Sequence, residues 1–297
     1  MDLIVKSGFG RKAIFAALRP GRLLDVPAGA GGYSKTLGEL GYGVVSMDLM
    51  PPAARATPLN WVRADANQPF PFAPASFDYL LSREGIEHLE NQIGFIRECA
   101  RVLKPGGMLL ITTPNLMHLS ARLSYLLTGQ RNLKRGLVNE VQFLRLSRGP
   151  HLYHGHVFMI DYFRLRYLLR LAGFEQLEVY SDRYSPTALA MAPLVPLLWA
   201  AARFSVWTAA RNNRRKRLPT APAAVTDEII GHVHSPALLF GKRMIVAARR
   251  SAEPADAATA SAAERAAGPA PPSSFATPSE TAHPQPPPIP GKDWQAR

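Results

Sequence analysis

The chain has 297 residues, 47% of them hydrophobic, which is enough for one large α/β domain or two small ones but not for many modules. Its single cysteine, Cys99, excludes an internal disulfide. The N-terminal residues lack the apolar stretch and small-residue cleavage site of a signal peptide, so we expect a cytoplasmic protein.

The formal net charge of +13 is unevenly distributed along the chain. Residues 251–297 contain three basic and five acidic side chains, so they carry −2 and leave +15 on residues 1–250. A basic body of this kind indicates an anionic partner, either a phospholipid surface or nucleic acid, unless the charge serves only general solubility.

Residues 1–20 predict a short basic helix, with Ile14, Phe15 and Leu18 on one side, that covers a sheet edge or the mouth of a binding site. Residues 22–40 then read as a hydrophobic strand containing Asp25, a loop of small residues and an amphipathic helix that Gly41 ends. A strand, glycine loop and helix in this order bring backbone N–H groups and a helix N-terminus to one point. This arrangement suits a nucleotide-like cofactor.

The glycine spacing argues against a dinucleotide. A dinucleotide site favours G-x-G-x-x-G, whereas Gly29-x-Gly31 is followed by Ser34 where the third glycine is expected. The string instead resembles the first motif of the class I S-adenosylmethionine-dependent methyltransferases, to which Asp25, Gly29 and Gly31 correspond. Pro27 stands where that family usually has its first glycine, and Ala28, also assigned to the cofactor loop, replaces the common Cys or Ser.

The next two predicted strands each end on an acidic residue. Residues 43–48 form a buried strand ending in Asp48, whose carboxylate, next to Leu49, is expected to accept hydrogen bonds from ribose hydroxyls. Residues 61–72 resemble the third strand and loop of the same methyltransferases, in which an Asp accepts from the adenine amino group and the next backbone N–H donates to the ring. The resemblance assigns these roles to Asp65 and Ala66.

Residues 76–82 predict the fourth strand, with Ser82 at its cofactor end. The string EHLEN…ECARVLKPGGMLLITTPN then resembles the fourth and fifth strands of small-molecule and lipid-type class I methyltransferases, so the resemblance covers residues 22–115. It implies S-adenosylmethionine as cofactor. The implied fold is a Rossmann-like α/β fold: a seven-stranded, mostly parallel sheet with an antiparallel last strand and helices on both faces.

Two insertions are expected within a methyltransferase domain of residues 1–250. Residues 116–156 resemble the family's substrate lid, and a helix beginning at Asp161 and a strand over 174–180 follow them. Residues 185–218 contain an apolar run that reaches the length of a membrane span, although Pro193, Pro196 and Arg203 weaken that interpretation.

The chain after this second insertion bears on whether it crosses a membrane. The last strand, predicted over residues 237–248, must rejoin the sheet, so we expect the insertion to lie on an anionic membrane surface, to re-enter, or to pack as a lid. Residues 251–297 hold ten of the 27 prolines and few large apolar residues, and they are predicted to be disordered.

Methyl transfer to an oxygen of high pKa needs a base, and the candidates are His88, His154 and His156, each of which is also compatible with a structural role. Glu84 and Glu87 are weaker candidates. The Asn-Pro-Pro-aromatic string of nucleobase amino methylation is missing, and no carboxylate trio resembles a catechol metal site, so we predict neither nucleic-acid methylation nor a metal.

These observations favour an S-adenosylmethionine-dependent O-methyltransferase that acts on a lipid, a lipid-linked glycan or a quinone-like acceptor at the inner face of the cytoplasmic membrane. An NAD-dependent oxidoreductase is one alternative, disfavoured by the missing glycine and the Asp65 motif. A membrane-docked protein that binds the cofactor without turnover is the other. The acceptor and the oligomeric state stay open at this point.

Overall fold

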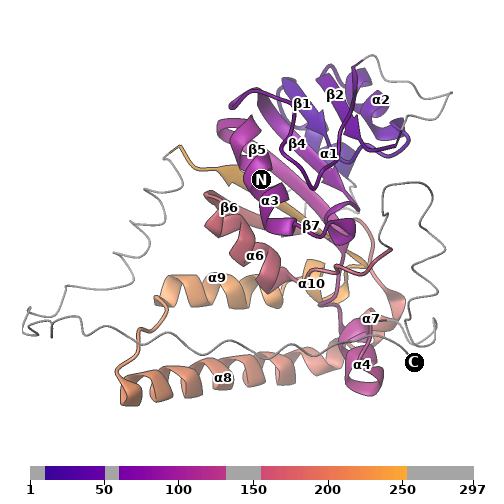
Figure 1. Cartoon of the computed structure of the whole chain (residues 1–297). Helices are drawn as coiled ribbons and strands as arrows, with labels where there is room; N and C mark the ends of the chain where they lie inside the picture. Colours follow the sequence, from indigo (N-terminus) through magenta and orange to yellow (C-terminus); the bar gives the residue numbers. More distant parts are fainter. Residues whose placement is uncertain (1–10, 51–59, 132–154, 253–297) are drawn as a thin grey trace, which may run out of the picture.

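The computed structural model describes residues 11–50, 60–131 and 155–252, whose strands form one seven-stranded sheet (Figure 1). The strand order is β3-β2-β1-β4-β5-β7-β6, and β7 is antiparallel to both of its neighbours. The strands are β1 (Arg22–Asp25), β2 (Gly43–Asp48), β3 (Trp61–Arg63), β4 (Phe77–Arg83), β5 (Leu103–Pro114), β6 (Phe174–Tyr180) and β7 (Arg243–Arg250). The predicted fold class is confirmed.

The central strands are buried on both faces, as expected of a parallel sheet covered by helices. On one face, α3 (Gln92–Val102) and α6 (Tyr162–Leu171) pack Phe95 and Leu165 into a cluster with Leu24, Leu80 and Leu109. On the other face, α1 (Arg11–Ala16) and α2 (Gly32–Glu39) join a second cluster, built around Phe15, Leu37, Leu23, Leu81 and Leu110. Alternate residues of each strand thus serve two cores.

The N-terminal helix lies elsewhere than either predicted position. Phe15 packs edge-on against Tyr42 and Tyr79, and the Tyr79 hydroxyl donates to the carbonyl of Arg19 at 3.0 Å. Tyr42 precedes β2 and Tyr79 lies early in β4, so this contact is near the amino ends of the strands. The described part of the segment therefore covers a face of the sheet at the end opposite the glycine loop, because its aromatic side chain finds apolar partners there.

The predicted last strand, 237–248, is wrong in its first part. Its first residues belong to α10 (Pro236–Phe240), and β7 begins only at Arg243. Ser235 caps this short helix with Pro236 in its first turn, a recognised start signal. The Asn115 side chain then donates to the carbonyls of Leu238 and Gly241, at 3.0 and 2.7 Å, and satisfies the end of the turn.

The segment after β5 contains α4 (Leu119–Thr128), which begins at the cap residue His118 and ends before Gly129 in the left-handed region. Asp161 caps α6 as predicted, its carboxylate accepting from the backbone N–H of Arg164 at 3.0 Å, and β6 has the predicted bounds. Much of the predicted lid, including His154, and the predicted disordered tail from residue 253 lie outside the described residues.

The hydrophobic insertion is helical. It consists of α7 (Pro186–Ala190), η3 (Ala192–Leu194) and the long α8 (Val195–Lys216), followed by α9 (Ala223–Val233). Pro193 and Pro196 lie in first helical turns, where proline starts a helix rather than breaking one. Figure 1 shows α8 beneath α9, at the opposite end of the molecule from β1 and β2. Within the described ranges, the helices do not combine the length and apolar character that crossing a bilayer requires.

Candidate active site

The glycine loop lies where the strand order reverses, between β1 and β4, and crevices at this point bind ligands in open α/β sheets. Asp25, the last residue of β1, is buried, and its Oδ2 accepts from the Ser34 hydroxyl at 2.6 Å. Burial raises its pKa to about 6, against the lowering effect of Ser34 and Arg83, while Asp48 adds a small further rise. The sequence had not indicated Ser34 as a partner of Asp25.

Asp48 organises the loop on the β2 side. Its Oδ2 accepts from the backbone N–H of Gly29 at 2.8 Å, and its Oδ1 accepts from that of Met50 at 2.9 Å. Burial raises the Asp48 pKa, and these backbone donors lower it. Gly29 and Gly31 have φ values of 60° and 78°, so glycine is needed at both positions. Leu49 follows directly and is half-buried.

The remaining predicted cofactor residues lie at the same edge of the sheet. Asp65 follows β3, and its Oδ1 accepts from the backbone N–H of Asn67 at 2.9 Å; Ala66 beside it is buried. Ser82 is buried near the carboxyl end of β4. The structure therefore gathers the predicted cofactor residues at the carboxyl ends of β1 to β4.

The polar groups of this edge fit a polar cofactor. Among the described residues, Asp25 Oδ1 and Ser82 Oγ are buried oxygens without a hydrogen-bond partner, and unpaired buried oxygens are costly unless a ligand or water satisfies them. A Cβ at Gly29 or Gly32 would meet no atom within 4 Å, so the loop borders open space.

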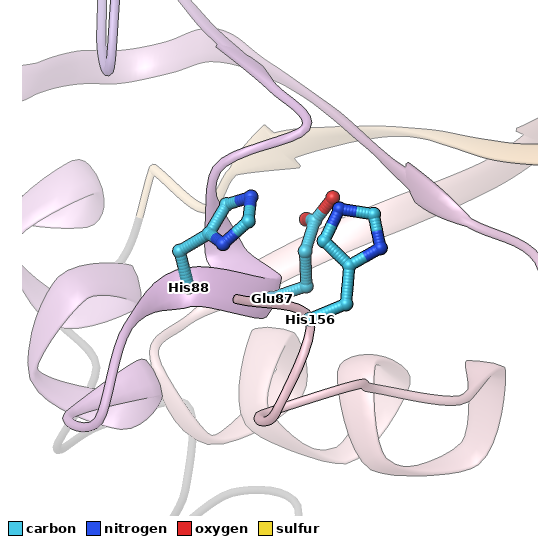
Figure 2. A group of neighbouring side chains, drawn as sticks. All are labelled: Glu87, His88 and His156. Atoms are coloured by element: carbon cyan, nitrogen blue, oxygen red, sulfur yellow. The ribbon is translucent and has the colours of Figure 1, made fainter. Parts of the chain in front are cut away.

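Two of the three predicted histidines come together. His88 ends the short helix η1 (Ile86–His88), His156 precedes α6, and their rings lie with centroids 5.0 Å apart. Figure 2 shows Glu87 between the same two side chains. One donor atom from each of the three residues lies within 4.8 Å of the other two.

Glu87 is the buried member of this cluster. Its Oε2 accepts from the Thr113 hydroxyl at 3.0 Å, and its Oε1 lacks a hydrogen-bond partner among the described residues. Burial raises the Glu87 pKa to about 7, and the neighbouring Glu84 contributes in the same direction. The sequence ranked Glu87 below the histidines because its spacing gives no information on burial.

Hydrogen bonds join the two segments that carry the cluster, and one of these segments adjoins the cofactor loop. The Gln92 amide donates to the carbonyls of Ile86 and Phe158, at 3.0 and 2.6 Å, and the Phe158 N–H donates to the carbonyl of Glu87 at 3.2 Å. A Cβ on Gly85 would lie 2.3 Å from Pro27 Cδ, so the loop after β4 touches the glycine loop directly.

Glu84 marks the turn that leads into the cluster. It is a non-glycine residue with a φ of 47°, a conformation that is often found at functional sites. Its N–H donates to the Thr112 carbonyl at 2.8 Å, and its Oε1 accepts from the Thr112 hydroxyl at 3.2 Å and lies 3.6 Å from Arg243 Nε. These contacts fix the conformation of the turn, and they could not be predicted from the sequence pattern.

Comparison with known proteins agrees with this geometry. Residues 24–111 match the family model described as "Methyltransferase domain". The "Ubiquinone biosynthesis O-methyltransferase" of Xanthomonas campestris pv. campestris (strain B100) is 32% identical over 33% of this chain and 45% of its own length. The protein of the same name from Xanthomonas euvesicatoria pv. vesicatoria is 28% identical over 56% of this chain and 67% of its own.

The chain thus spans about 45% of the first of these relatives. Among solved structures, a SAM-dependent methyltransferase from Archaeoglobus fulgidus is 14% identical, with a TM-score of 0.46 over 81% of this chain and 90% of that one.

The strand order and the glycine loop define a Rossmann-like nucleoside-binding domain, with its site at the β1–β4 switch point. Residues 24–111 match the methyltransferase-domain family, in line with the predicted resemblance to class I S-adenosylmethionine-dependent methyltransferases. The match agrees with the predicted enzyme class and with S-adenosylmethionine as the predicted cofactor for residues 24–111. The roles assigned to individual side chains stay predictions.

Proposed function

We propose that the protein methylates an oxygen of an apolar, hydroxyl-bearing acceptor at the cytoplasmic face of an anionic membrane. The observation that carries this proposal is the Glu87–His88–His156 cluster, which adjoins the cofactor loop at the carboxyl ends of β4 and β5. An acceptor hydroxyl that faces the cofactor's methyl group can lie over this cluster. The names of the relatives make a quinone precursor the first acceptor class to test, ahead of other lipids or lipid-linked glycans.

In this proposal the protein aligns two reactants and excludes water. S-adenosylmethionine supplies an electrophilic methyl carbon on a sulfonium. Asp48 would hold the ribose and Asp65 the adenine through charge-assisted hydrogen bonds, and the open glycine loop would admit the rest of the cofactor. Alignment within a closed site can supply much of the rate enhancement of an in-line displacement.

The membrane part of the proposal rests on α8. Its described side chains are all at least partly exposed, and they include the large apolar residues Leu197, Trp199, Phe204 and Trp207. Its last turn carries Arg214, Arg215 and Lys216. Aromatic residues combined with a basic end are typical of helices that lie in the interface of an anionic membrane.

The same helix is connected to the acceptor side of the sheet. Leu119 of α4, Ala188 of α7 and Leu239 of α10 form a small core on which Val195 and Leu198 of α8 pack. α4 follows closely after β5, and it exposes Leu126 and Leu127, at 82% and 62%. A lipid-embedded acceptor beside α4 and α8 would therefore meet the segment that follows β5, the strand whose Thr113 contacts Glu87.

The test is turnover with purified protein. With S-adenosylmethionine and a polyprenylated catechol in vesicles, we expect S-adenosylhomocysteine and a product one methylene heavier, both measured by mass spectrometry. A catechol without the prenyl chain should react more slowly, because it does not concentrate at the membrane. Cofactor binding without S-adenosylhomocysteine formation would favour a binding protein. Lipid extracts from cells with and without the protein would reveal a glycan or other lipid acceptor.

A further inference from the structure

Three potential metal ligands converge from two distant segments of the chain. Glu87 and His88 come from η1 after β4, whereas His156 comes from the stretch before α6. Their donor atoms lie within 4.8 Å of one another, and Figure 2 shows the carboxylate and the two imidazoles gathered in one place. We propose that these side chains bind a divalent transition-metal ion, with zinc as the ion to test first.

The donor set selects the kind of ion. Two imidazole nitrogens and one carboxylate suit zinc and its neighbours in the first transition row, whereas magnesium and calcium prefer oxygen ligands throughout. Ligands around a tetrahedral zinc ion lie about 3.3 Å apart, given bond lengths near 2.0–2.1 Å. The observed spread is wider, and the exposed side chain of His156 can close the difference by rotating.

The buried carboxylate gives an independent indication of a cation. Glu87 is fully buried, yet its Oε1 has no hydrogen-bond partner among the described residues. A cation bound at this oxygen would satisfy it, and buried charges in proteins are usually paired or bound to metal. Oε2 is already fixed by the Thr113 hydroxyl at 3.0 Å, which resembles the outer hydrogen bond that orients a metal-bound carboxylate.

The scaffold around the ligands is fixed by hydrogen bonds. Gln92 donates to carbonyls on both ligand-bearing segments, and the Phe158 N–H donates to the carbonyl of Glu87 itself. His156 is therefore held two residues from an anchored position. Three protein ligands leave a coordination position open, which is the arrangement of catalytic rather than structural zinc sites.

The open position gives the ion a role that rests on the proposed function. An acceptor hydroxyl bound there would lose its proton to solvent more readily, because a metal ion lowers the pKa of a bound oxygen. That oxygen then attacks the methyl carbon, and the carbon–sulfur bond breaks to release S-adenosylhomocysteine. In this role His88 and His156 bind metal and are not the general bases that the sequence suggested.

The experiment is a zinc titration of tag-free, chelator-treated full-length protein, followed by isothermal calorimetry and by metal analysis after dialysis. We expect one zinc ion per chain. Zinc binding should weaken by more than about tenfold in each of the variants Glu87→Gln, His88→Ala and His156→Ala. Losing a residue that only hydrogen-bonds to a metal ligand already costs at least about tenfold in metal affinity. The control His234→Gln alters a histidine at the end of α9 that contacts the Ile230 carbonyl and is not one of the three clustered ligands, and it should bind as the wild type does.

Absence of zinc binding, or affinity unchanged in both Glu87→Gln and His156→Ala, would overturn the site. His156 is exposed, so its variant keeps the test decisive even if Glu87→Gln does not fold. Cobalt substitution adds a second readout, since visible absorption should be lost in the same variants. The zinc titration uses no acceptor, so a protein that binds no zinc can still carry out the proposed methyl transfer. A protein that binds zinc but shows no turnover would overturn only the proposed function.

Discussion

Asp48 is the residue at which the cofactor loop and the second strand meet. It accepts from Gly29 and Met50 main-chain N–H groups in this structure, and a carboxylate has capacity for the ribose hydroxyls as well. Asp65 is engaged only with Asn67 among the hydrogen bonds described for its carboxylate. Replacing these two residues should therefore have different consequences.

Ala at Asp48 or at Asp65 is expected to cost about 1.5–3 kcal/mol of S-adenosylhomocysteine binding, because each change removes charge-assisted hydrogen bonds. That corresponds to roughly ten- to hundredfold in Kd by calorimetry. Asp48→Ala should also lower the melting temperature, because Gly29 and Met50 lose their acceptor, whereas Asp65→Ala should do so less. If both variants bind S-adenosylhomocysteine as tightly as the wild type, Asp48 and Asp65 do not contact the cofactor.

The pH dependence of cofactor binding should depend on Asp25. Its pKa is raised to about 6, so its carboxyl is ionised at pH 7 and protonated at pH 5. If the cationic cofactor prefers the ionised form, its affinity should fall about tenfold from pH 7 to pH 5. The cofactor affinity of Asp25→Asn should not change over this pH range. If the affinities of wild type and variant fall equally steeply, another group is responsible for the titration.

The same raised pKa sets the sign of the effect on folding. The folded state holds the Asp25 proton more tightly than the unfolded chain, whose carboxyl titrates near 3.8. Asp25 therefore makes the cofactor-free protein less stable as pH rises from about 4 to about 6. A buried carboxyl that weakens the empty protein and favours a cationic ligand is consistent with a binding role.

The sequence predicted the residues of the proposed cofactor half of the site better than those of the proposed acceptor half. The predicted cofactor half lies within one contiguous strand-loop-helix unit and two strand ends, so local order and the family resemblance were enough to nominate Asp25, Asp48 and Asp65. The proposed acceptor half depends on contacts between η1 and the stretch before α6, which are distant in sequence. Spacing could nominate His88 and His156 singly, but their meeting at Glu87 follows only from the fold.

At the scale of helices, α6 and α9 are joined by an ion pair that the sequence did not reveal. Arg166, only 8% exposed, donates to both Glu228 oxygens at 2.7 and 2.9 Å. The guanidinium beside it lowers the pKa of Glu228. Because Arg166 is shielded from water, its partner matters more than that of an ordinary surface charge.

Glu228→Gln should lower the free energy of unfolding by about 1–3 kcal/mol in urea denaturation, because a buried charge loses its partner. Asp227→Asn is the matched control on the same helix. Asp227 pairs with Arg203 of α8 at 3.0 Å, but both side chains are about half exposed, so its loss should stay within about 0.5 kcal/mol. Equal effects of the two changes would mean that burial does not set the strength of these pairs.

The ends of helices and strands were predicted correctly where local sequence signals set them, and wrongly where contacts with distant residues decide. Asp161 and Gly173 delimit α6 through cap chemistry that sequence displays, and the prediction was correct there. The error at α10 arose because Ala237 to Phe240 are all apolar and therefore suit either a buried strand or a buried turn of helix. The capping Ser235 and the side chain of Asn115 decide in favour of the helix.

For the whole molecule, the arrangement of charge leads to a prediction about membranes. The basic last turn and exposed aromatics of α8 lie at the end of the molecule remote from α2 (Figure 1). Full-length protein should float with anionic vesicles, less so in high salt, and not with neutral ones. Changing Arg214, Arg215 and Lys216 to Gln should weaken partitioning by about 3 kcal/mol, or roughly a hundredfold.

A matched control changes three exposed basic residues away from α8, Lys35, Arg63 and Arg97, to Gln. Net charge falls equally, but flotation should persist. If both triple variants bind anionic vesicles equally weakly, the net charge of the protein rather than the position of α8 determines the attraction to the membrane. If the wild type never floats, α8 serves as a lid or as a contact for another protein.

The position of β7 between β5 and β6 has a consequence for synthesis on the ribosome. β6 pairs with β7 alone, so it has no sheet neighbour until residues 243–250 have been made. By then α8 is already outside the exit tunnel or close to it, with its aromatic face uncovered and its end basic. Under the proposed membrane docking, a nascent chain can settle on a membrane through α8 before the sheet closes, and the final strand then completes the sheet at that surface.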